Sequence, residues 1–276
     1  MPSPVSCPVP SQPWSHLTTT DFARLDPDRT IAVLPVSACE QHGAHLPLST
    51  DAVINAGVIK QALNSLDSSV TVLILPAQEI GDSIEHTDFP GTLTAEFDDL
   101  VRSWLAIGES VSRAGVSKML IFNTHGGQRG HVDQAAIRLR ARHNMLVARV
   151  NGSALGLPPA LINDTEQRFG FHGGEIETSM MLHLAPELVR REHLAHYRSA
   201  GEKLAAANQV LGAEKPAGFG WMAQDLNPHG VTGNAANASA ANGRLIVQHM
   251  AERLALLCLE LANAKSDLLT NKAITD

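Results

Sequence analysis

Four short runs rich in valine, isoleucine and leucine most strongly constrain how this chain can fold. They lie at residues 30–36, 70–76, 118–123 and 145–151. Each run is almost continuously apolar rather than alternating, which is typical of parallel strands covered by helices on both faces. Helical periodicity is found at residues 51–66, 95–114, 130–143, 175–184 and 235–264. This order of elements predicts an α/β fold with three layers, in which a mostly parallel sheet lies between helices.

The domain organisation follows from length and local composition. With 276 residues, the chain can bury the core of one large domain. No shift in composition marks an internal boundary, so residues 21–276 are predicted to form a single catalytic domain. Residues 1–20 are predicted to be a loose arm, because they begin with a stretch rich in proline and serine. Residues 213–233 are rich in glycine, proline and asparagine and carry Trp221 and His229, which predicts a functional loop or a lid.

Charge and hydropathy narrow the class of partner. The formal net charge is −7 and no lysine or arginine cluster is present, whereas binding to a nucleic-acid backbone needs a concentrated basic surface. No apolar run reaches the length of a bilayer span, and no secretory signal is recognisable. The three cysteines lack the spacing of a disulfide framework or a zinc ribbon. We therefore expect a cytoplasmic protein with a small-molecule substrate and with neither nucleic-acid nor membrane partners.

The segment after the first predicted strand carries a first group of potential metal ligands. Glu40 and His42 are two residues apart, so both side chains point to one side if the segment is extended. Asp51 follows at a predicted helix start. Carboxylate and imidazole groups are ligands of zinc, manganese and iron, and a carboxylate can bridge two ions. A polar turn with a capping aspartate is the alternative interpretation.

Two further segments carry potential metal ligands, one after a predicted strand and one at the start of a predicted helix. His125 follows the third predicted strand, and the next two glycines allow a ligand to approach the backbone closely. His172 precedes a predicted helix that begins with Glu175 and Glu177. These two glutamates are about 200° apart on a helix, so only one of them is expected to face a metal. The alternatives are a structural histidine and an acidic first turn that complements the helix dipole.

Taken in order, these motifs resemble the creatininase (creatinine amidohydrolase) family. The resemblance rests on Glu-Gln-His-Gly at 40–43, His-Leu-Pro-Leu at 45–48, Asp51, Phe-Pro-Gly-Thr at 89–92, Thr-His-Gly-Gly at 124–127 and His-Gly-Gly-Glu-Ile-Glu-Thr-Ser at 172–179. It covers roughly residues 31–186 and extends to Gly-Val-Thr-Gly at 230–233. It implies a single α/β domain, two divalent metal ions (Zn, Mn or Fe) per chain and a homohexamer.

The resemblance also implies a role for each matching residue. Glu40 and His125 are expected to bind one ion, His42 the other, and Asp51 both. His172 corresponds to the proton-transfer histidine of the family.

One ligand of the family is missing from this chain. Creatininase completes its second metal site with a glutamate two residues after the strand-end histidine, a position that is Gly127 here. We expect Glu175 to supply this ligand. Glu177 is the second candidate, and it is otherwise placed with His172 among the catalytic residues.

The substrate pocket also departs from that of creatininase. The family enzyme uses a tyrosine directly after the strand-end histidine and a tryptophan shortly before the proton-transfer histidine. Gly126 stands at the first position, and no tryptophan stands at the second. The surface around Phe171 therefore differs, and we expect negligible hydrolysis of creatinine. His86, Gly126 and Phe171 are the candidate substrate-binding residues.

The expected reaction is hydrolysis of a C–N bond in a small amide, linear or cyclic. Two cations acidify a water to a pKa near neutrality, and His172 then delivers a proton to the leaving group. Cys39 is interpreted as a small buried residue, because the metal-activated hydroxide already provides a nucleophile. Two alternatives stay open: a hydrolase or isomerase of a cyclic keto-sugar of the keto-inositol type, and a catalytically silent metal-binding subunit.

Overall fold

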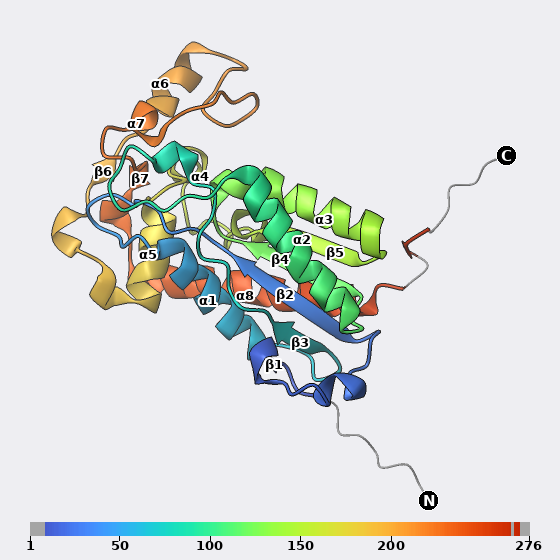
Figure 1. The fold of residues 1–276 in the computed structure, drawn as a ribbon. Helices are drawn as coiled ribbons and strands as arrows, with labels where there is room; N and C mark the ends of the chain where they lie inside the picture. Colours follow the sequence, from blue (N-terminus) through green and yellow to red (C-terminus); the bar gives the residue numbers. More distant parts are fainter. Residues whose placement is uncertain (1–8, 266–267, 271–276) are drawn as a thin grey trace, which may run out of the picture.

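The computed structural model describes residues 9–265 and 268–270, and a five-stranded sheet forms its centre (Figure 1). The strands are β1 (Gln12–Pro13), β2 (Thr30–Val36), β3 (Thr71–Ile74), β4 (Lys118–Asn123) and β5 (Leu146–Asn151). Their order across the sheet is β1-β3-β2-β4-β5, and all neighbouring pairs are parallel. Val36 pairs with Asn123, so β2 and β4 end side by side.

Successive residues of the central strands face two separate apolar cores. One core receives Ile31, Val33, Leu120 and Phe122. The other receives Ala32, Leu34, Val36, Met119 and Ile121. Because strand side chains alternate between faces and both faces are covered, every one of these positions must be apolar. This is the physical reason for the continuous apolar runs in the sequence.

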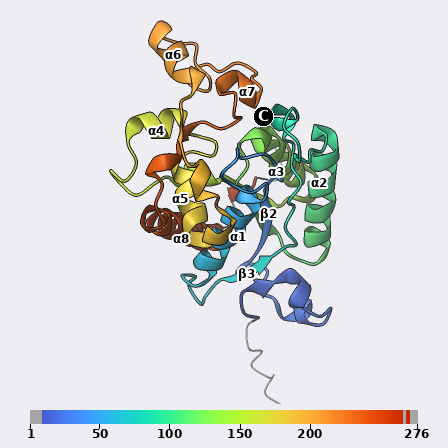
Figure 2. The same ribbon diagram turned by 90° about the vertical axis from the view of Figure 1, so that its left-hand side faces the viewer.

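Helices cover the two faces of the sheet (Figure 2). On one face lie α1 (Thr50–Leu63), α5 (Glu175–Leu184) and α8 (Ala240–Asn263), which pack against one another. On the other face lie α2 (Phe97–Arg113) and α3 (Arg129–His143), with Trp104 of α2 almost fully buried. The three-layer α/β/α prediction is confirmed.

The helices that follow β2 and β4 lie on opposite faces of the sheet, and this determines where a ligand can bind. Helix α1 leads from β2 to β3 over one face, whereas α3 leads from β4 to β5 over the other. The side chain of Asn55 from α1 joins the two strand ends, because its Nδ2 donates to the carbonyl oxygens of Val36 and Phe122, each at 3.1 Å. Open α/β sheets bind ligands beyond the carboxyl ends of their strands at such a switch point.

Smaller elements cover this end of the sheet. They are α4 (Asp164–Phe169), α6 (Ala200–Ala207), α7 (Ala223–Leu226) and the antiparallel pair of β6 (His196–Tyr197) with β7 (Gly233–Asn234). Helices α6 and α7 stand away from the sheet at the top of Figure 1. The segment 213–233, which we expected to be a loop without secondary structure, contains α7 and the first residue of β7. These elements are too short to produce a periodic pattern in the sequence.

The structure differs from the expected loose arm. Within residues 9–20, β1 pairs with the edge of β3, and Thr71 Oγ1 donates to the carbonyl oxygen of Val9 at 2.8 Å. The ring of Trp14 lies 4.8 Å from that of Phe22. This part of the segment therefore extends the sheet by one strand, whereas residues 1–8 lie outside the described residues.

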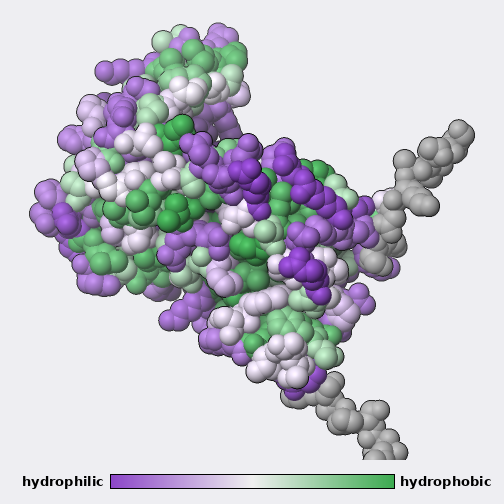
Figure 3. Space-filling view, viewed as in Figure 1, coloured by the Kyte–Doolittle hydropathy of each residue, from purple (hydrophilic) through white to green (hydrophobic). Residues whose placement is uncertain are grey.

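The outer surface of α2 is polar, as Figure 3 shows for the face viewed there. Its exposed residues include Asp98, Asp99 and Arg102. Among the described helices, none combines the length and the apolar character that a membrane crossing requires.

Candidate metal centre

The segment after β2 places Glu40 and His42 in the interior of the chain. Both are almost completely buried, with exposed fractions of 1% and 0%. His42 Nδ1 lies 3.1 Å from the carbonyl oxygen of Glu40 and can donate to it. A neutral His42 that donates through Nδ1 carries a lone pair on Nε2, which is the form that binds a metal. That Nε2 lies 3.6 Å from Asp51 Oδ1 and has no hydrogen-bond partner among the described residues.

Asp51 lies in the first turn of α1, directly beside the strand ends. Thr124 Oγ1 donates to the backbone carbonyl oxygen of Asp51 at 3.0 Å, which ties this turn to the residue after β4. The two carboxylate oxygens face different histidines. Oδ1 lies 3.6 Å from His42 Nε2, and Oδ2 lies 3.6 Å from His125 Nδ1. This is the arrangement expected of a carboxylate that bridges two ions.

His125 is oriented from the side opposite to the carboxylates. Its Nε2 lies 2.7 Å from the backbone carbonyl oxygen of Asp82 and can donate to it. The lone pair is then on Nδ1, which lies 3.1 Å from Glu40 Oε2. The buried oxygens Glu40 Oε2 and Asp51 Oδ2 have no hydrogen-bond donor within the described chain.

Helix α5 presents Glu177, and not Glu175, to this group. Glu177 Oε2 lies 3.8 Å from His42 Nε2 and also accepts a hydrogen bond from the backbone nitrogen of Gly173 at 2.6 Å. The carboxyl group of Glu175 instead faces Glu166 and Asn237. The structure thus differs from the expectation for Glu175, because the rotation of α5 decides which of two glutamates on opposite sides of the helix points inward.

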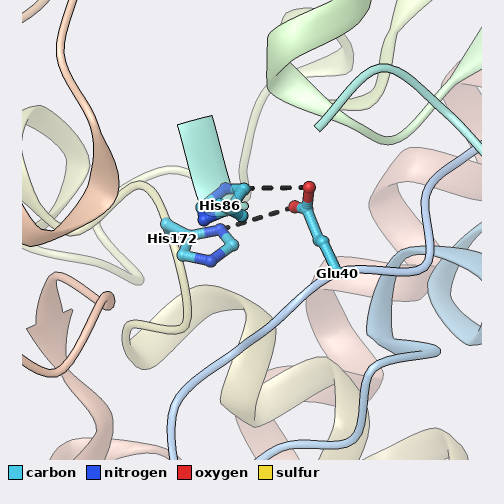
Figure 4. Close-up of side chains that lie close together, drawn as sticks. All are labelled: Glu40, His86 and His172. Atoms are coloured by element: carbon cyan, nitrogen blue, oxygen red, sulfur yellow. Dashed lines mark ion pairs between the residues drawn. The ribbon is translucent and has the colours of Figure 1, made fainter. Parts of the chain in front are cut away.

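Two further histidines stand over Glu40 (Figure 4). His86 Nε2 lies 3.6 Å from Glu40 Oε2, and His172 Nδ1 lies 3.8 Å from Glu40 Oε1. The two rings stack with their centroids 4.3 Å apart. Gln41 holds both of them: its Nε2 lies 2.8 Å from His86 Nδ1, and its backbone carbonyl oxygen lies 2.9 Å from His172 Nε2. The sequence motifs contain Gln41, but only the structure reveals this positioning role.

The charges in this group shift the pKa values of its members strongly. Burial lowers the pKa of His125, but the neighbouring carboxylates of Glu40 and Asp51 outweigh it and raise that pKa to about 10. For His42, burial is likewise outweighed by Asp51 and Glu177, which raise the pKa to about 9. Burial raises the pKa of Glu177 to about 7 despite the nearby His42. In His86 burial prevails and lowers the pKa to about 4.

The donor set fits divalent metal ions. Oxygen and nitrogen atoms of Glu40, Asp51 and His125 lie within 4.8 Å of one another, and so do those of His42, His172 and Glu177. Carboxylates and imidazoles suit zinc, manganese and iron. Leaving Glu40 Oε2, Asp51 Oδ2 and His42 Nε2 buried without partners is unfavourable, and a bound metal would remove this cost.

The structure explains why no side chain is found at position 127. A Cβ atom built on Gly127 would lie 2.2 Å from Glu85 Oε1 and 2.7 Å from His125 Nε2. Glu85 Oε1 itself lies 3.8 Å from His125 Nε2. The carboxylate of Glu85 therefore occupies the space into which a glutamate at position 127 would have to extend.

A cavity of about 110 Å³ opens above the candidate ligands. Its wall contains all three residues that the sequence indicated for substrate binding, namely His86, Gly126 and Phe171. It also contains Trp221, whose ring centroid lies 5.7 Å from that of Phe171. The motif analysis found no tryptophan next to His172. The structure brings Trp221 close to Phe171 from a distant segment. The only sequence signal for this contact was that Trp221 lies in the predicted lid, residues 213–233.

Comparison with known proteins identifies the family. The family model described as creatininase, creatinine amidohydrolase, matches residues 15–258. The chain belongs to the creatininase family. It is accordingly a creatininase-family hydrolase, as the motifs indicated.

The curated relatives of this creatininase-family chain carry two different names. A mycofactocin precursor peptide peptidase of Mycobacterium ulcerans is 29% identical over 242 residues, covering 86% of this chain and 88% of that protein. Its counterpart in Mycobacterium tuberculosis is 30% identical over 226 residues, covering 80% and 81%. A creatinine amidohydrolase of Pseudomonas putida is 24% identical over 202 residues, covering 67% and 76%.

Solved structures show the same fold. A mutant creatininase complexed with creatine has a TM-score of 0.74 at 24% identity, covering 92% of this chain and 100% of that one. A structure described as creatininase with Mn has a TM-score of 0.73 at 23% identity, with the same coverage.

Proposed function

We propose that this chain is a binuclear metal-dependent amidohydrolase. One ion would be held by Glu40, Asp51 and His125 and the second by His42, Asp51 and Glu177. The observation that carries this proposal is the arrangement of Asp51, whose two oxygens face His42 Nε2 and His125 Nδ1 at 3.6 Å each. Glu175 is left out of the ligand set because its carboxyl group faces Glu166 and Asn237.

Two divalent ions would supply an acidified water and polarise the carbonyl group of the substrate. The side chains of the chain itself orient the reacting groups and move the proton. His172 donates through Nε2 to the carbonyl oxygen of Gln41, so its free Nδ1 can take up a proton and pass it to the leaving nitrogen. His86 accepts from the Gln41 amide through Nδ1, which directs its Nε2 toward Glu40 Oε2 at 3.6 Å.

The substrate is proposed to be a peptide-like amide rather than creatinine. The mycobacterial relatives at 29% and 30% identity are named as peptide peptidases, whereas the creatinine amidohydrolase is 24% identical. Both names describe cleavage of a C–N bond. Neither points to a keto-sugar, and both argue against a silent subunit.

The direct test is metal content measured together with activity. Metal-free protein is loaded with zinc, manganese or iron, and its metal is determined by elemental analysis. We expect two ions per chain and hydrolysis of dipeptides, with creatinine turnover far below about 10 per second, the usual rate of metabolic enzymes. A single ion per chain after full loading would contradict the binuclear site. Creatinine turnover near that rate would contradict the proposed substrate class.

We expect the protein to form a homohexamer and to be located in the cytoplasm. Membership in the creatininase family supports the hexamer, and the thiols of Cys39 and Cys258, which are free, are compatible with a reducing compartment. Light scattering coupled to size-exclusion chromatography measures the oligomeric state, and a monomer would contradict it.

A further inference from the structure

A second cavity of about 280 Å³ lies beside the cavity of the candidate ligands, and we call it the side cavity. The two cavities share six wall residues: Thr124, His125, Gly126, Arg129, Phe171 and Glu177. The side cavity therefore lies directly next to the place where a reacting carbonyl group would sit.

Part of the inner wall of the side cavity is apolar. Ile54 of α1, Met180 of α5 and Met250 of α8 form it and are each at most 4% exposed. Ile176 and Leu157 add two partly buried apolar side chains. Two polar residues of the wall bond to each other, because Asn151 Oδ1 accepts a hydrogen bond from Asn123 Nδ2 at 2.8 Å. Water next to these apolar side chains has few partners, so an apolar group displaces it favourably there.

The size of the side cavity indicates what fits. A cavity of about 150 Å³ lined by apolar side chains is large enough to bind benzene. The side cavity is larger than this, and its outer rim carries the polar groups of Arg129, Ser153 and Gln167. It can thus hold an aromatic ring or a branched aliphatic group that bears a polar substituent at its outer end.

Gly126 lies at the boundary between the two cavities, because it lines both of them. A Cβ atom at this position would meet only Arg129 Nη2, at 3.7 Å, and the backbone of Gly126 is not left-handed. A larger side chain is therefore compatible with the local backbone and would extend into this boundary. A side chain at position 126 would therefore reduce the space between the side cavity and the ligands.

We propose that the side cavity is the specificity pocket of the enzyme and binds an aromatic or branched apolar group attached to one side of the scissile amide. This inference rests on the proposed amidohydrolase function. It goes beyond it by assigning the substrate class: amides that carry a ring-sized apolar side chain next to the bond that is cleaved.

The test compares ring-bearing with small amides on metal-loaded protein. The substrates are Gly-Phe, Phe-Gly, Gly-Leu and Gly-Gly, which place the apolar group on either side of the bond or remove it. We expect kcat/KM for at least one of the first three to exceed that for Gly-Gly by at least about tenfold, as for groups that fill an apolar pocket. In Gly126→Leu and in Ser153→Trp, which enlarge two separate lining residues of the cavity, this ratio should fall toward one.

Gly130→Leu is the matched control, because a Cβ atom at Gly130 meets nothing within 4 Å and this residue lines neither cavity. It should retain the wild-type ratio. Equal kcat/KM values for all four dipeptides, or a preference that survives both cavity-filling substitutions, would overturn the proposal.

A binding measurement separates this proposal from the proposed function. Benzylamine carries a ring but no amide, and its affinity can be measured by calorimetry without turnover. We expect both filled variants to bind it at least about tenfold more weakly than the wild type and Gly130→Leu. If no dipeptide is hydrolysed but this pattern of binding is found, the proposed amidohydrolase function is refuted while the proposed apolar pocket is supported. Equal binding by all variants would reject the pocket.

Discussion

The ligand cavity and the side cavity share a wall but are built on different physical principles. The ligand cavity is small, about 110 Å³, and is surrounded by buried carboxylates and imidazoles that hold one another at distances of 3.1 to 3.8 Å. The side cavity is larger, about 280 Å³, and its wall combines aliphatic and thioether side chains with polar groups. Metal binding in the ligand cavity depends on the positions of individual atoms, whereas binding of an apolar group in the side cavity depends on its volume. Substitutions in the two cavities should therefore have different effects on metal binding and on substrate selectivity.

The largest effect is expected for Asp51→Ala in the ligand cavity. Among the described residues, Asp51 alone has a carboxylate that faces both His42 and His125, so its removal should release both ions. Metal ions contribute several kcal/mol to such reactions, so hydrolysis should fall by about a thousandfold or more. Elemental analysis and dipeptide hydrolysis measure the two effects. Retention of both ions would refute the bridging role.

The next effect separates the two glutamates of α5. Glu177→Gln should lose one ion and with it most of the activity, because its carboxylate lies 3.8 Å from His42 Nε2. Glu175→Gln is the matched control on the same helix and should retain both ions. Metal content of the two proteins, purified side by side, decides the assignment. The reverse result would restore the expectation drawn from the sequence.

His172→Ala tests whether a residue can act in the ligand cavity without binding metal. Loss of a positioned proton-transfer group costs about a hundredfold or more in rate. Both ions should stay bound, since Nε2 of this ring is held by the carbonyl oxygen of Gln41. An empty metal site in this variant would show that His172 is a ligand.

Metal affinity should depend on pH because the candidate ligands themselves titrate. In the metal-free chain the pKa values of His42 and His125 are raised to about 9 and 10, so both rings are protonated at pH 7. Metal binding must displace these protons, and affinity should rise about tenfold per pH unit for each displaced proton, up to about pH 9 to 10. Calorimetric zinc titrations in buffers of different ionisation enthalpy measure the number of protons that are released on binding. Binding without proton release would contradict this charge state.

The smallest effect is expected for Trp221→Ala, which sharpens the boundary between the cavities. Trp221 lines the ligand cavity but not the side cavity. Loss of its contact with Phe171 is worth about 1 kcal/mol, so KM should rise by about fivefold for ring-bearing and small dipeptides alike. A selective loss for Gly-Phe would instead assign Trp221 to the specificity pocket.

Much of the fold could be predicted because it follows from short-range patterns. Strands β2 and β4 were predicted with the observed limits, since both of their faces are buried and every position is apolar. Helix α8 was predicted to begin at residue 235 but begins at Ala240, where the Ser239 side chain caps it by accepting from the Asn242 nitrogen. Strand β1 was missed, because two residues at a sheet edge carry no periodic signal.

The candidate site was predictable only where it lies on these elements. Glu40, His42 and His125 follow parallel strands that end side by side, and Asp51 begins the helix after one of them, so the sequence brings all four together. Glu177 was ranked behind Glu175, because spacing shows that the two point apart but not which one faces inward.

The sequence by itself determined the layered α/β architecture, the family and the chemical types of the candidate ligands. These depend on periodicity and on motifs a few residues long, which local chain geometry translates directly into structure. The tertiary structure decided the rotation of α5, the meeting of Trp221 with Phe171 and the volume of the side cavity. Each of these depends on how distant helices and loops pack, and packing sums many weak contacts between residues that are not neighbours in the chain.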